Sequence, residues 1–102
     1  MKWTYFFSIA IFYLESGQIR HENYDNYEDL NWSINSDCEK VRIKSVKFKT
    51  QKMYDIITID DKIYSGNAII DQVAPSNFTI SFKSSKFNTD TGFVIHWNCT
   101  DL

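Results

Sequence analysis

Residues 78–82 (FTISF) and 93–97 (FVIHW) decide the fold class, because apolar side chains occupy every second position in both. This period of two is the pattern of a β-strand that buries one face. Shorter runs of the same kind occur upstream, at residues 32–34, 41–43, 46–48 and 56–59. No segment keeps apolar residues at helical spacing over three turns. The chain is therefore predicted to be all-β, folded as a sandwich or barrel.

Turn-forming residues separate these runs. Turns are predicted at residues 65–67 (SGN), 74–76 (APS) and 88–92 (NTDTG), and a hairpin turn at Asp60-Asp61. The alternation shifts by one residue before Val46, which predicts a β-bulge. Residues 18–31 are polar and rich in Tyr and Asn, so we expect a loop there with at most one short strand.

Length and composition predict one compact domain. The 102 residues include 43% hydrophobic side chains and carry a formal net charge of −2. This length allows a single core. The near balance of charge gives no general attraction to nucleic acid, and no acidic tail or low-complexity tract indicates disorder. We therefore expect no nucleic-acid partner.

The N-terminus differs in kind from the rest of the chain. Lys2 precedes a nearly unbroken apolar run at residues 3–14. This run is too short to span a bilayer as a helix, which takes about 20 residues, but it fits the core of a signal peptide. We predict that residues 1–17 are a signal peptide and that residues 18–102 form a secreted domain with no membrane span. The alternative is that residues 6–14 form a buried first strand.

Three N-x-S/T triplets point to the same secretory route. They begin at Asn31, Asn77 and Asn98. In a secreted protein such triplets are acceptors for N-glycosylation, so we predict a glycoprotein.

The two cysteines, Cys38 and Cys99, are too far apart for a C-x-x-C redox or zinc motif. In an oxidising compartment the simple pairing joins them in one disulfide, which closes a loop of about 60 residues. The loop-entropy model gives such a bridge roughly 4 kcal/mol of stabilisation. The alternative is two unpaired, buried thiols in a cytosolic protein.

Several elements, in order along the chain, resemble the CUB domain family. They are Gly17-Gln18-Ile19, Asn23-Tyr24, Asn26-Tyr27, residues 30–34 (LNWSI), Val41-x-Ile43, Phe48-x-Thr50-Gln51, Tyr54-Asp55 with Ile59, Ser65-Gly66, residues 78–84 and residues 92–97. The similarity covers about residues 17–99 and implies an antiparallel β-sandwich of the jelly-roll type. The family's cysteine before the Trp is Asn31 here, and its middle cysteine pair is absent, so a single bridge between Cys38 and Cys99 is expected.

Many CUB domains bind a calcium ion at one end of the sandwich, where it orders loops that capture a lysine of the partner. The resemblance implies that Asp55 and Asn88 occupy two ligand positions, whereas Gln51 and Ser85 stand where the family has carboxylates. Calcium takes about 6–8 oxygens, several of them anionic. Because one carboxylate remains, we predict a degenerate site that binds no calcium, and no other cofactor. Asp55 is then expected to be a capping or turn residue.

No pattern predicts catalysis. His21 falls in the polar segment and His96 on the outward side of its strand, and neither belongs to a catalytic or metal-binding motif. Turn chemistry accounts for Asp60-Asp61. We therefore expect a protein that is not an enzyme.

The stretch from residue 40 to residue 52 is the most basic part of the chain. Alternation and the bulge together place four cations on one face: Arg42, Lys44, Lys47 and Lys49. Such a face suits a sulfated glycan or an acidic protein. The alternative is a solvated face whose lysines discourage edge pairing.

Tyr24 and Tyr27 are candidates for a recognition loop, or their rings close one end of the sandwich. Taken with the missing catalytic motifs, these features predict a secreted, CUB-like, non-catalytic module that binds an extracellular protein or glycan. The alternatives are a targeting domain of a larger extracellular protease and a calcium-dependent adhesion protein.

Overall fold

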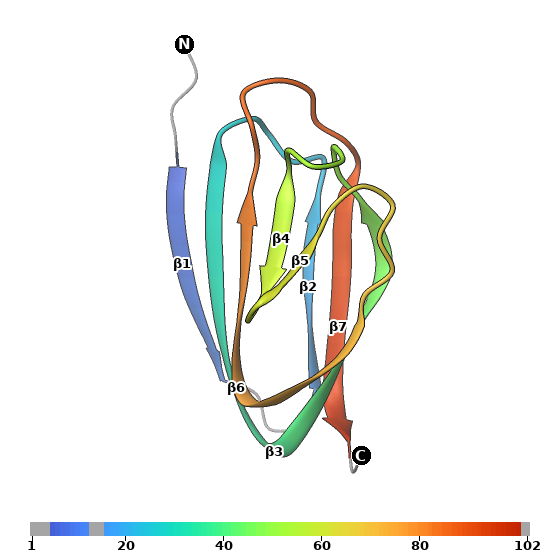
Figure 1. The fold of residues 1–102 in the computed structure, drawn as a ribbon. Helices are drawn as coiled ribbons and strands as arrows, with labels where there is room; N and C mark the ends of the chain where they lie inside the picture. The colour runs from blue at the N-terminus through green and yellow to red at the C-terminus, as the bar shows by residue number, and fades with distance from the viewer. Residues whose placement is uncertain (1–4, 13–15, 101–102) are drawn as a thin grey trace.

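The computed structural model describes residues 5–12, for their backbone, and residues 16–100. The strands in these residues are β1 (Tyr5–Phe12), β2 (Ser16–Glu22), β3 (Glu28–Lys49), β4 (Ile56–Ile59), β5 (Lys62–Tyr64), β6 (Asp71–Lys83) and β7 (Gly92–Thr100). Figure 1 shows their arrangement. Within the described ranges there is no helix of the length and apolarity that a bilayer span requires.

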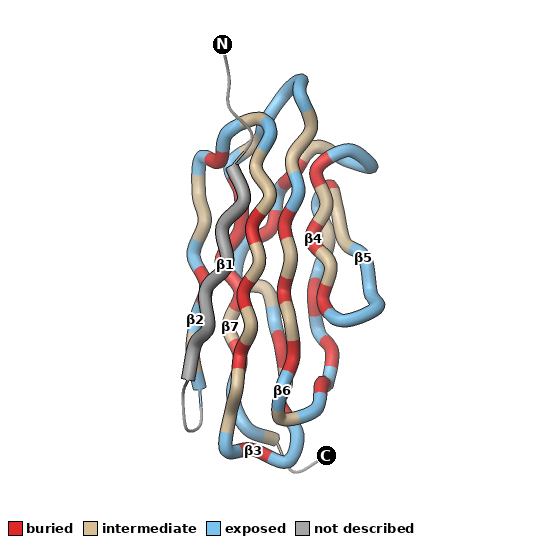
Figure 2. The backbone as a smooth tube through the Cα atoms, turned by 90° about the vertical axis from the view of Figure 1, so that its left-hand side faces the viewer, coloured by how far each residue is buried: buried red, intermediate tan, exposed pale blue. Residues whose placement is uncertain are grey.

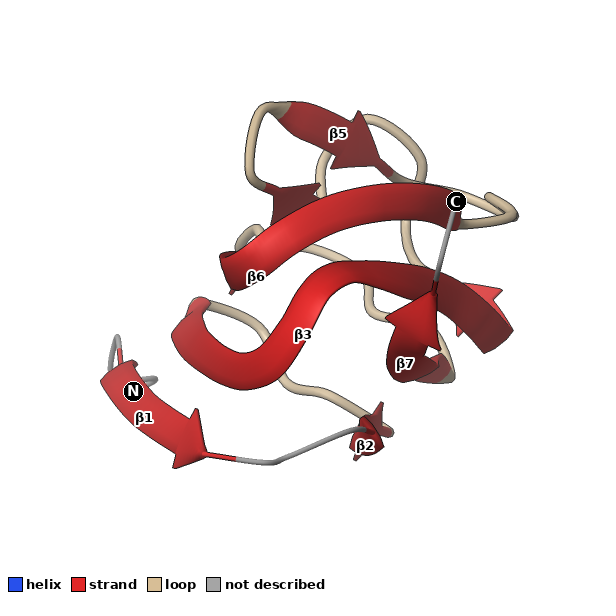
Figure 3. Ribbon diagram, turned by 90° about the horizontal axis from the view of Figure 1, so that it is seen from below, coloured by secondary structure: helices blue, strands red, loops and turns tan. Residues whose placement is uncertain are grey.

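One bent sheet makes up the domain, with the strand order β2-β7-β3-β6-β4-β5. These neighbours are antiparallel, whereas β1 pairs with β3 in parallel. The two long strands, β3 and β6, each contribute to two layers. We call these the β4 layer (the first half of β3, the second half of β6, and β1, β4 and β5) and the β7 layer (the second half of β3, the first half of β6, and β2 and β7). The curl of β3 that joins the layers is visible in Figure 3.

The bend in β3 changes which residues face the core. β3 advances five residues, from Asn35 to Lys40, while β6 advances two, from Asn77 to Pro75. The surplus is odd, and successive side chains of a strand point to opposite faces. Even-numbered residues therefore face inward before the bend, and odd-numbered residues face inward from the bend as far as Ser45. At the bend, Ser36 donates its hydroxyl to the Ser76 carbonyl at 2.8 Å, in place of a ladder bond.

The inner faces of the two layers form the core. Phe82 of the β4 layer lies edge-on to Phe93 of the β7 layer with ring centroids 5.1 Å apart, and Phe78 meets Trp97 at 5.9 Å. Along β6 buried positions alternate with exposed or half-buried ones, as Figure 2 shows by colour. The all-β antiparallel sandwich predicted from the period of two is confirmed.

Most predicted local features are also confirmed. The pairing of β3 with β7 shifts between Ser45 and Lys47, which is the predicted bulge, and its extra residue, Val46, is exposed. The hairpin turn at Asp60-Asp61 joins β4 to β5, with Asp60 in the left-handed region at φ 52°.

Two local predictions are wrong. The predicted turn at residues 74–76 lies inside β6, where the segment around Pro75 pairs with β3 alone among the described strands. Proline lacks an N–H, so a strand tolerates it where one edge is open. The segment 18–31, expected to be a loop with at most one short strand, contains the last five residues of β2 and also the start of β3, and Ile19 and Leu30 are buried at core positions.

The strand β1 occupies part of the predicted signal peptide. It pairs with β3 from Tyr5 opposite Glu28 to Phe12 opposite Asn35. Residues 1–4 and 13–15 lie outside the described residues, and β2 begins at Ser16, two residues before the predicted domain boundary. Removal of residues 1–17 stays a prediction.

The predicted disulfide is present. It joins Cys38, in the bend of β3, to Cys99, near the end of β7, with the two Cα atoms 5.3 Å apart. Cys99 stands opposite Val41 in the pairing of β7 with β3. The bridge therefore fixes the bend of β3 to the β7 layer.

Loss of this disulfide is expected to lower the free energy of unfolding by about 4 kcal/mol, because the unfolded chain regains the freedom of a loop of 61 residues. Urea unfolding of the Cys38→Ala/Cys99→Ala variant measures the change, and the reduced native protein provides the matched control. Equal unfolding midpoints for the oxidised and reduced proteins would contradict the prediction.

Candidate functional site

Loops from distant parts of the sequence meet at one end of the sandwich, which we call the loop end (Figure 1). The loop at residues 23–27 is bonded to the loop at residues 84–91 through Asn23 N–H to the Thr91 carbonyl, at 2.8 Å. Thr50 N–H donates to the Gly66 carbonyl at 3.0 Å and so ties two further loops together. The backbone of these loops is therefore cross-linked by hydrogen bonds.

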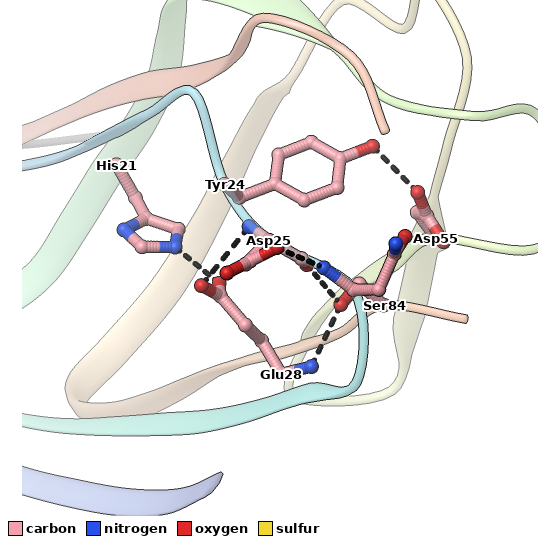
Figure 4. A network of polar contacts seen from close by, with 7 residues as sticks. His21, Tyr24, Asp25, Glu28, Asp55 and Ser84 are labelled. Carbon is pink, nitrogen blue, oxygen red and sulfur yellow. Dashed lines mark hydrogen bonds and ion pairs between the residues drawn. The ribbon is translucent and has the colours of Figure 1, made fainter. Parts of the chain in front are cut away.

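A buried carboxylate lies at the centre of the loop end. The Asp55 side chain is fully buried, and its two oxygens have different donors: the Tyr24 hydroxyl at 2.6 Å and the Ser85 backbone N–H at 2.7 Å. Figure 4 shows the bond between Tyr24 and Asp55. A buried charge is tolerated only when it is well paired. One carboxylate thus holds three loops in place.

Tyr24 is buried. Of the two alternatives for this residue, exposure in a recognition loop is therefore wrong, and the ring closes the end of the sandwich. The ring stands edge-on to Phe82 at 4.8 Å, and its hydroxyl also accepts the Gln51 N–H at 3.2 Å. Burial, and next the bond to Asp55, raise the pKa of Tyr24 above its ordinary value, because a phenolate there would be desolvated beside a carboxylate. Tyr27 is 36% exposed.

A second network braces the start of β3 (Figure 4). The Glu28 carboxylate contacts His21 Nε2 and accepts the Asp25 N–H at 3.1 Å. The Ser84 hydroxyl accepts the Glu28 N–H at 2.7 Å and donates to the Asp25 carbonyl at 2.6 Å. The sequence placed His21 in a polar loop. That placement is wrong, because His21 is a half-buried residue of β2. His96 lies half-buried on the outward side of β7.

The residues at the implied calcium positions come together, but they do not fit the ion. Both Asp55 oxygens already accept hydrogen bonds, and the Ser85 hydroxyl is bonded to the Gln51 side-chain oxygen at 3.2 Å and to the Phe87 carbonyl at 3.0 Å. Asn88 lines the adjoining cavity. Among residues 16–100, no three His, Cys, Asp or Glu side chains are grouped as metal ligands. Direct hydrogen bonds hold these loops together.

Beside this network lies an open cavity of about 430 Å³, lined by Gln51, Tyr54, Ser85, Lys86, Phe87 and Asn88. Tyr54 and Phe87 flank it and are 66% and 65% exposed, and neighbouring Met53 is 74% exposed. The Lys86 ammonium lies 5.0 Å from the centre of the Phe87 ring. We call Met53, Tyr54, Lys86 and Phe87 the loop-end patch.

Sequence reasoning missed this patch. In the sequence, Tyr54 was noted only as the neighbour of Asp55, and Phe87 does not belong to any of the alternating apolar runs that predict strands. The available signal was an aromatic residue isolated in a polar loop. Met53 and Asn88 also have positive φ angles, 72° and 62°, a backbone conformation that non-glycine residues adopt at a cost.

The predicted basic face lies on the outside of the β7 layer, but it is partly neutralised. Arg42 makes a two-bond pair with Asp71, at 2.9 and 3.0 Å, and holds the pKa of that carboxyl below its usual range. Lys47 donates to Glu22 at 2.9 Å. Within the described part of the chain, Lys44 and Lys49 make no ion pair.

The three acceptor asparagines lie on strands. Asn77 of β6 and Asn98 of β7 are exposed, whereas Asn31 of β3 is half-buried and its side-chain oxygen lies 3.4 Å from the Ser81 hydroxyl. Their glycosylation stays a prediction.

Comparisons with known proteins support the fold. No protein-family model and no curated protein sequence matches the chain. The structure is similar to the CUB1-EGF-CUB2 domains of rat MASP-1, with a TM-score of 0.73 and 18% identity over 91% of this chain and 43% of that one. It is also similar to the full extracellular region of zebrafish Gpr126/Adgrg6, with a TM-score of 0.69 and 18% identity over 89% of this chain and 14% of that one. The chain spans less than half the length of either, and its fold is CUB-like.

Tyr24→Phe is expected to lower the free energy of unfolding by about 1–3 kcal/mol, because Asp55 loses a donor and the Gln51 N–H loses its acceptor. Urea unfolding measures the loss, and Tyr54→Phe, which removes an exposed hydroxyl, should change stability by less than about 0.5 kcal/mol. Equal effects of the two substitutions would contradict the role of Tyr24.

The raised pKa of Tyr24 has a consequence for alkaline stability. The folded state favours the protonated phenol, so the stabilisation is complete below the unfolded pKa, about 10, and is lost as the pH rises above it. The wild-type protein should therefore lose more stability above about pH 10 than Tyr24→Phe does.

Calcium at about 5 mM, enough for the weaker extracellular sites, should leave the melting temperature of the protein unchanged relative to EDTA. Gln51→Glu/Ser85→Asp, which restores two carboxylates beside Asp55, should acquire a melting temperature that rises with calcium. A calcium-dependent rise in the wild-type protein would overturn this expectation.

Proposed function

We propose that the chain is a secreted, non-catalytic binding module that contacts an extracellular protein through the loop-end patch. The observation that carries this proposal is the exposure of Tyr54 and Phe87 on loops fixed by the buried Asp55 network. Tyr, Met and Arg are enriched at protein interfaces, and aromatic anchors beside a pocket supply most of the binding energy.

The network beneath the patch makes it a low-cost surface to bind. Ordering side chains and loops on association costs free energy, and a pre-organised surface avoids part of that cost. Here Asp55 links the loop that carries Tyr54 to the Ser85 end of the loop that carries Phe87. Backbone strain at Met53 and Asn88 fits this view, since such strain persists where the surroundings impose it and often marks functional sites.

The chemistry of the same groups favours binding over catalysis. Asp55 is fully buried and each of its oxygens accepts a hydrogen bond from within the fold, so the carboxylate is not exposed to an external substrate. The Ser85 hydroxyl is bonded to an amide oxygen and a backbone carbonyl, neither of which can take its proton as a general base. A nucleophile without an adjacent base is not activated.

Secretion is supported by the disulfide, by the acceptor triplets and by the apolar N-terminal run. Disulfides persist in oxidising compartments and are rare in the cytosol. The similarity to an extracellular region, that of Gpr126/Adgrg6, is in agreement. The basic face is the weaker candidate surface, because Asp71 and Glu22 offset two of its four cations.

The test is retention of partners from the native extracellular fluid by immobilised variants of the protein. Tyr54→Ala/Phe87→Ala should weaken capture of the specific partner at least about tenfold, since anchor residues contribute roughly 2 kcal/mol or more. Capture should also survive high salt, which screens exposed charges.

Lys44→Ala/Lys49→Ala is the matched control and should leave capture unchanged. Both variants alter exposed side chains, so their melting temperatures should stay close to that of the wild-type protein. Loss of capture in the lysine variant or in high salt, with capture retained by the aromatic variant, would transfer the function to the basic face and a sulfated or acidic partner.

A further inference from the structure

The edge of β3 between Glu28 and Asn35 is a second surface of interest, because its covering strand lies in the predicted signal peptide. On one side this segment pairs with β6, and on the other with β1, residue by residue. β7 covers the same side of β3 only from Lys40 onward. Among the described strands, β1 is therefore the only cover of this eight-residue edge (Figure 1).

Beyond its first two residues, this edge lacks the features that protect exposed strands from pairing. Natural sheets blunt their edges with lysine, proline, bulges or very short strands. Residues 28–35 (EDLNWSIN) carry charge only at Glu28 and Asp29; residues 30–35 contain no charged residue and no proline, and the pairing with β6 shows no bulge before Asn35.

The other edges of the sheet are protected. β5 has three residues and includes Lys62, and the first half of β6 carries Pro75. β2 alternates Arg20 with Glu22 on its outward side. The β3 edge is thus the one in the described sheet that is built to be covered.

The segment that covers it indicates the chemistry of the occupant. Residues 5–12 (YFFSIAIF) carry no charge, and their register sets Phe7, Ile9 and Ile11 beside core positions of β3. The alternate residues of β1 stand beside the outward positions of β3: Phe6 beside Asp29, Ser8 beside Asn31, Ala10 beside Ser33 and Phe12 beside Asn35. Within residues 7–11, large apolar residues therefore alternate with small ones, which is the period of a strand.

We propose that, once residues 1–17 are removed on secretion, this edge accepts an extended, uncharged segment of a partner protein by strand addition. The added strand runs parallel to β3, as β1 does, and has large apolar residues at every second position. Main-chain hydrogen bonds supply the affinity in this mode, and the alternate side chains supply the selectivity. A second copy of the chain would pair about a two-fold axis and hence antiparallel, unlike the pairing that the structure shows. The inference rests on the secretion proposed above.

The experiment uses the full chain expressed through a secretory pathway, with the N-terminus of the product read from its intact mass. Ser33→Ala is introduced to remove the Asn31 acceptor triplet, so that no glycan stands at the edge. The probe is a fluorescent peptide with the sequence of residues 5–12 between flanking lysines, and binding is followed by fluorescence anisotropy. We expect a product that begins near residue 18, is monomeric and binds the peptide saturably.

Two N-methylated peptides test whether the binding is strand addition. One is methylated at Phe6, Ser8 and Ala10, and the other at Phe7, Ile9 and Ile11. Since successive N–H groups of a strand point to opposite edges, one peptide should lose binding and the other should keep it. If both or neither lose binding, the contact is not a strand pairing and the inference fails.

The remaining outcomes also decide the matter. If the secreted product keeps residues 5–12, its own β1 covers the edge and the inference is wrong. If the product is a dimer that binds no peptide, a second copy of the chain covers the edge, and the inference is also wrong. Tyr54→Ala/Phe87→Ala should bind the peptide as the wild-type protein does. If the peptide binds and the Tyr54→Ala/Phe87→Ala variant captures the partner normally, the β3 edge is supported and the loop-end patch is ruled out. If the peptide does not bind and the variant loses capture, only the proposal for the edge is ruled out.

Discussion

The two layers of the sandwich share the long strands β3 and β6, and the packing of the domain depends on how β3 bends. The odd surplus of residues between Asn35 and Lys40 turns the odd-numbered side chains of the second half toward the core. The bulge at Val46 then reverses the phase once more, so that Phe48 is buried. Without these two shifts, one end of β3 would present charged side chains to the core. The disulfide at Cys38 holds the bend where this geometry requires it.

At the loop end, the buried Asp55 carboxylate holds the loops together through hydrogen bonds. Asp55 accepts hydrogen bonds from the Tyr24 hydroxyl and from the Ser85 backbone N–H, which are both neutral groups of the chain itself. Charge-assisted hydrogen bonds of this kind are strong inside a protein, where the dielectric constant is low. The loops that expose Tyr54 and Phe87 therefore rest on a fixed base, and exposed aromatic side chains on a fixed base are suited to protein recognition.

The charged face shows how tertiary structure alters a sequence pattern. Alternation and the bulge place Arg42, Lys44, Lys47 and Lys49 together, as the sequence indicated. The acids that offset two of them, Asp71 and Glu22, come from β6 and β2. A count of cations along one strand cannot include acids that reach the face from its neighbours.

The sequence alone determined most of the strands, the bulge and the hairpin turn, because alternation and turn chemistry are properties of a few consecutive residues. The cysteine pair was expected because only two cysteines are present. It also indicated Asp55, Ser85 and Asn88 as members of one site through a family resemblance, although not how they bond. Only the tertiary structure decided that Tyr24 is buried against Asp55, 31 residues away, and that Tyr54 and Phe87 share one exposed patch. The period of two tells which face a residue takes within its strand. Which loops then meet depends on the bend and the register of β3, and these follow from packing across the whole chain.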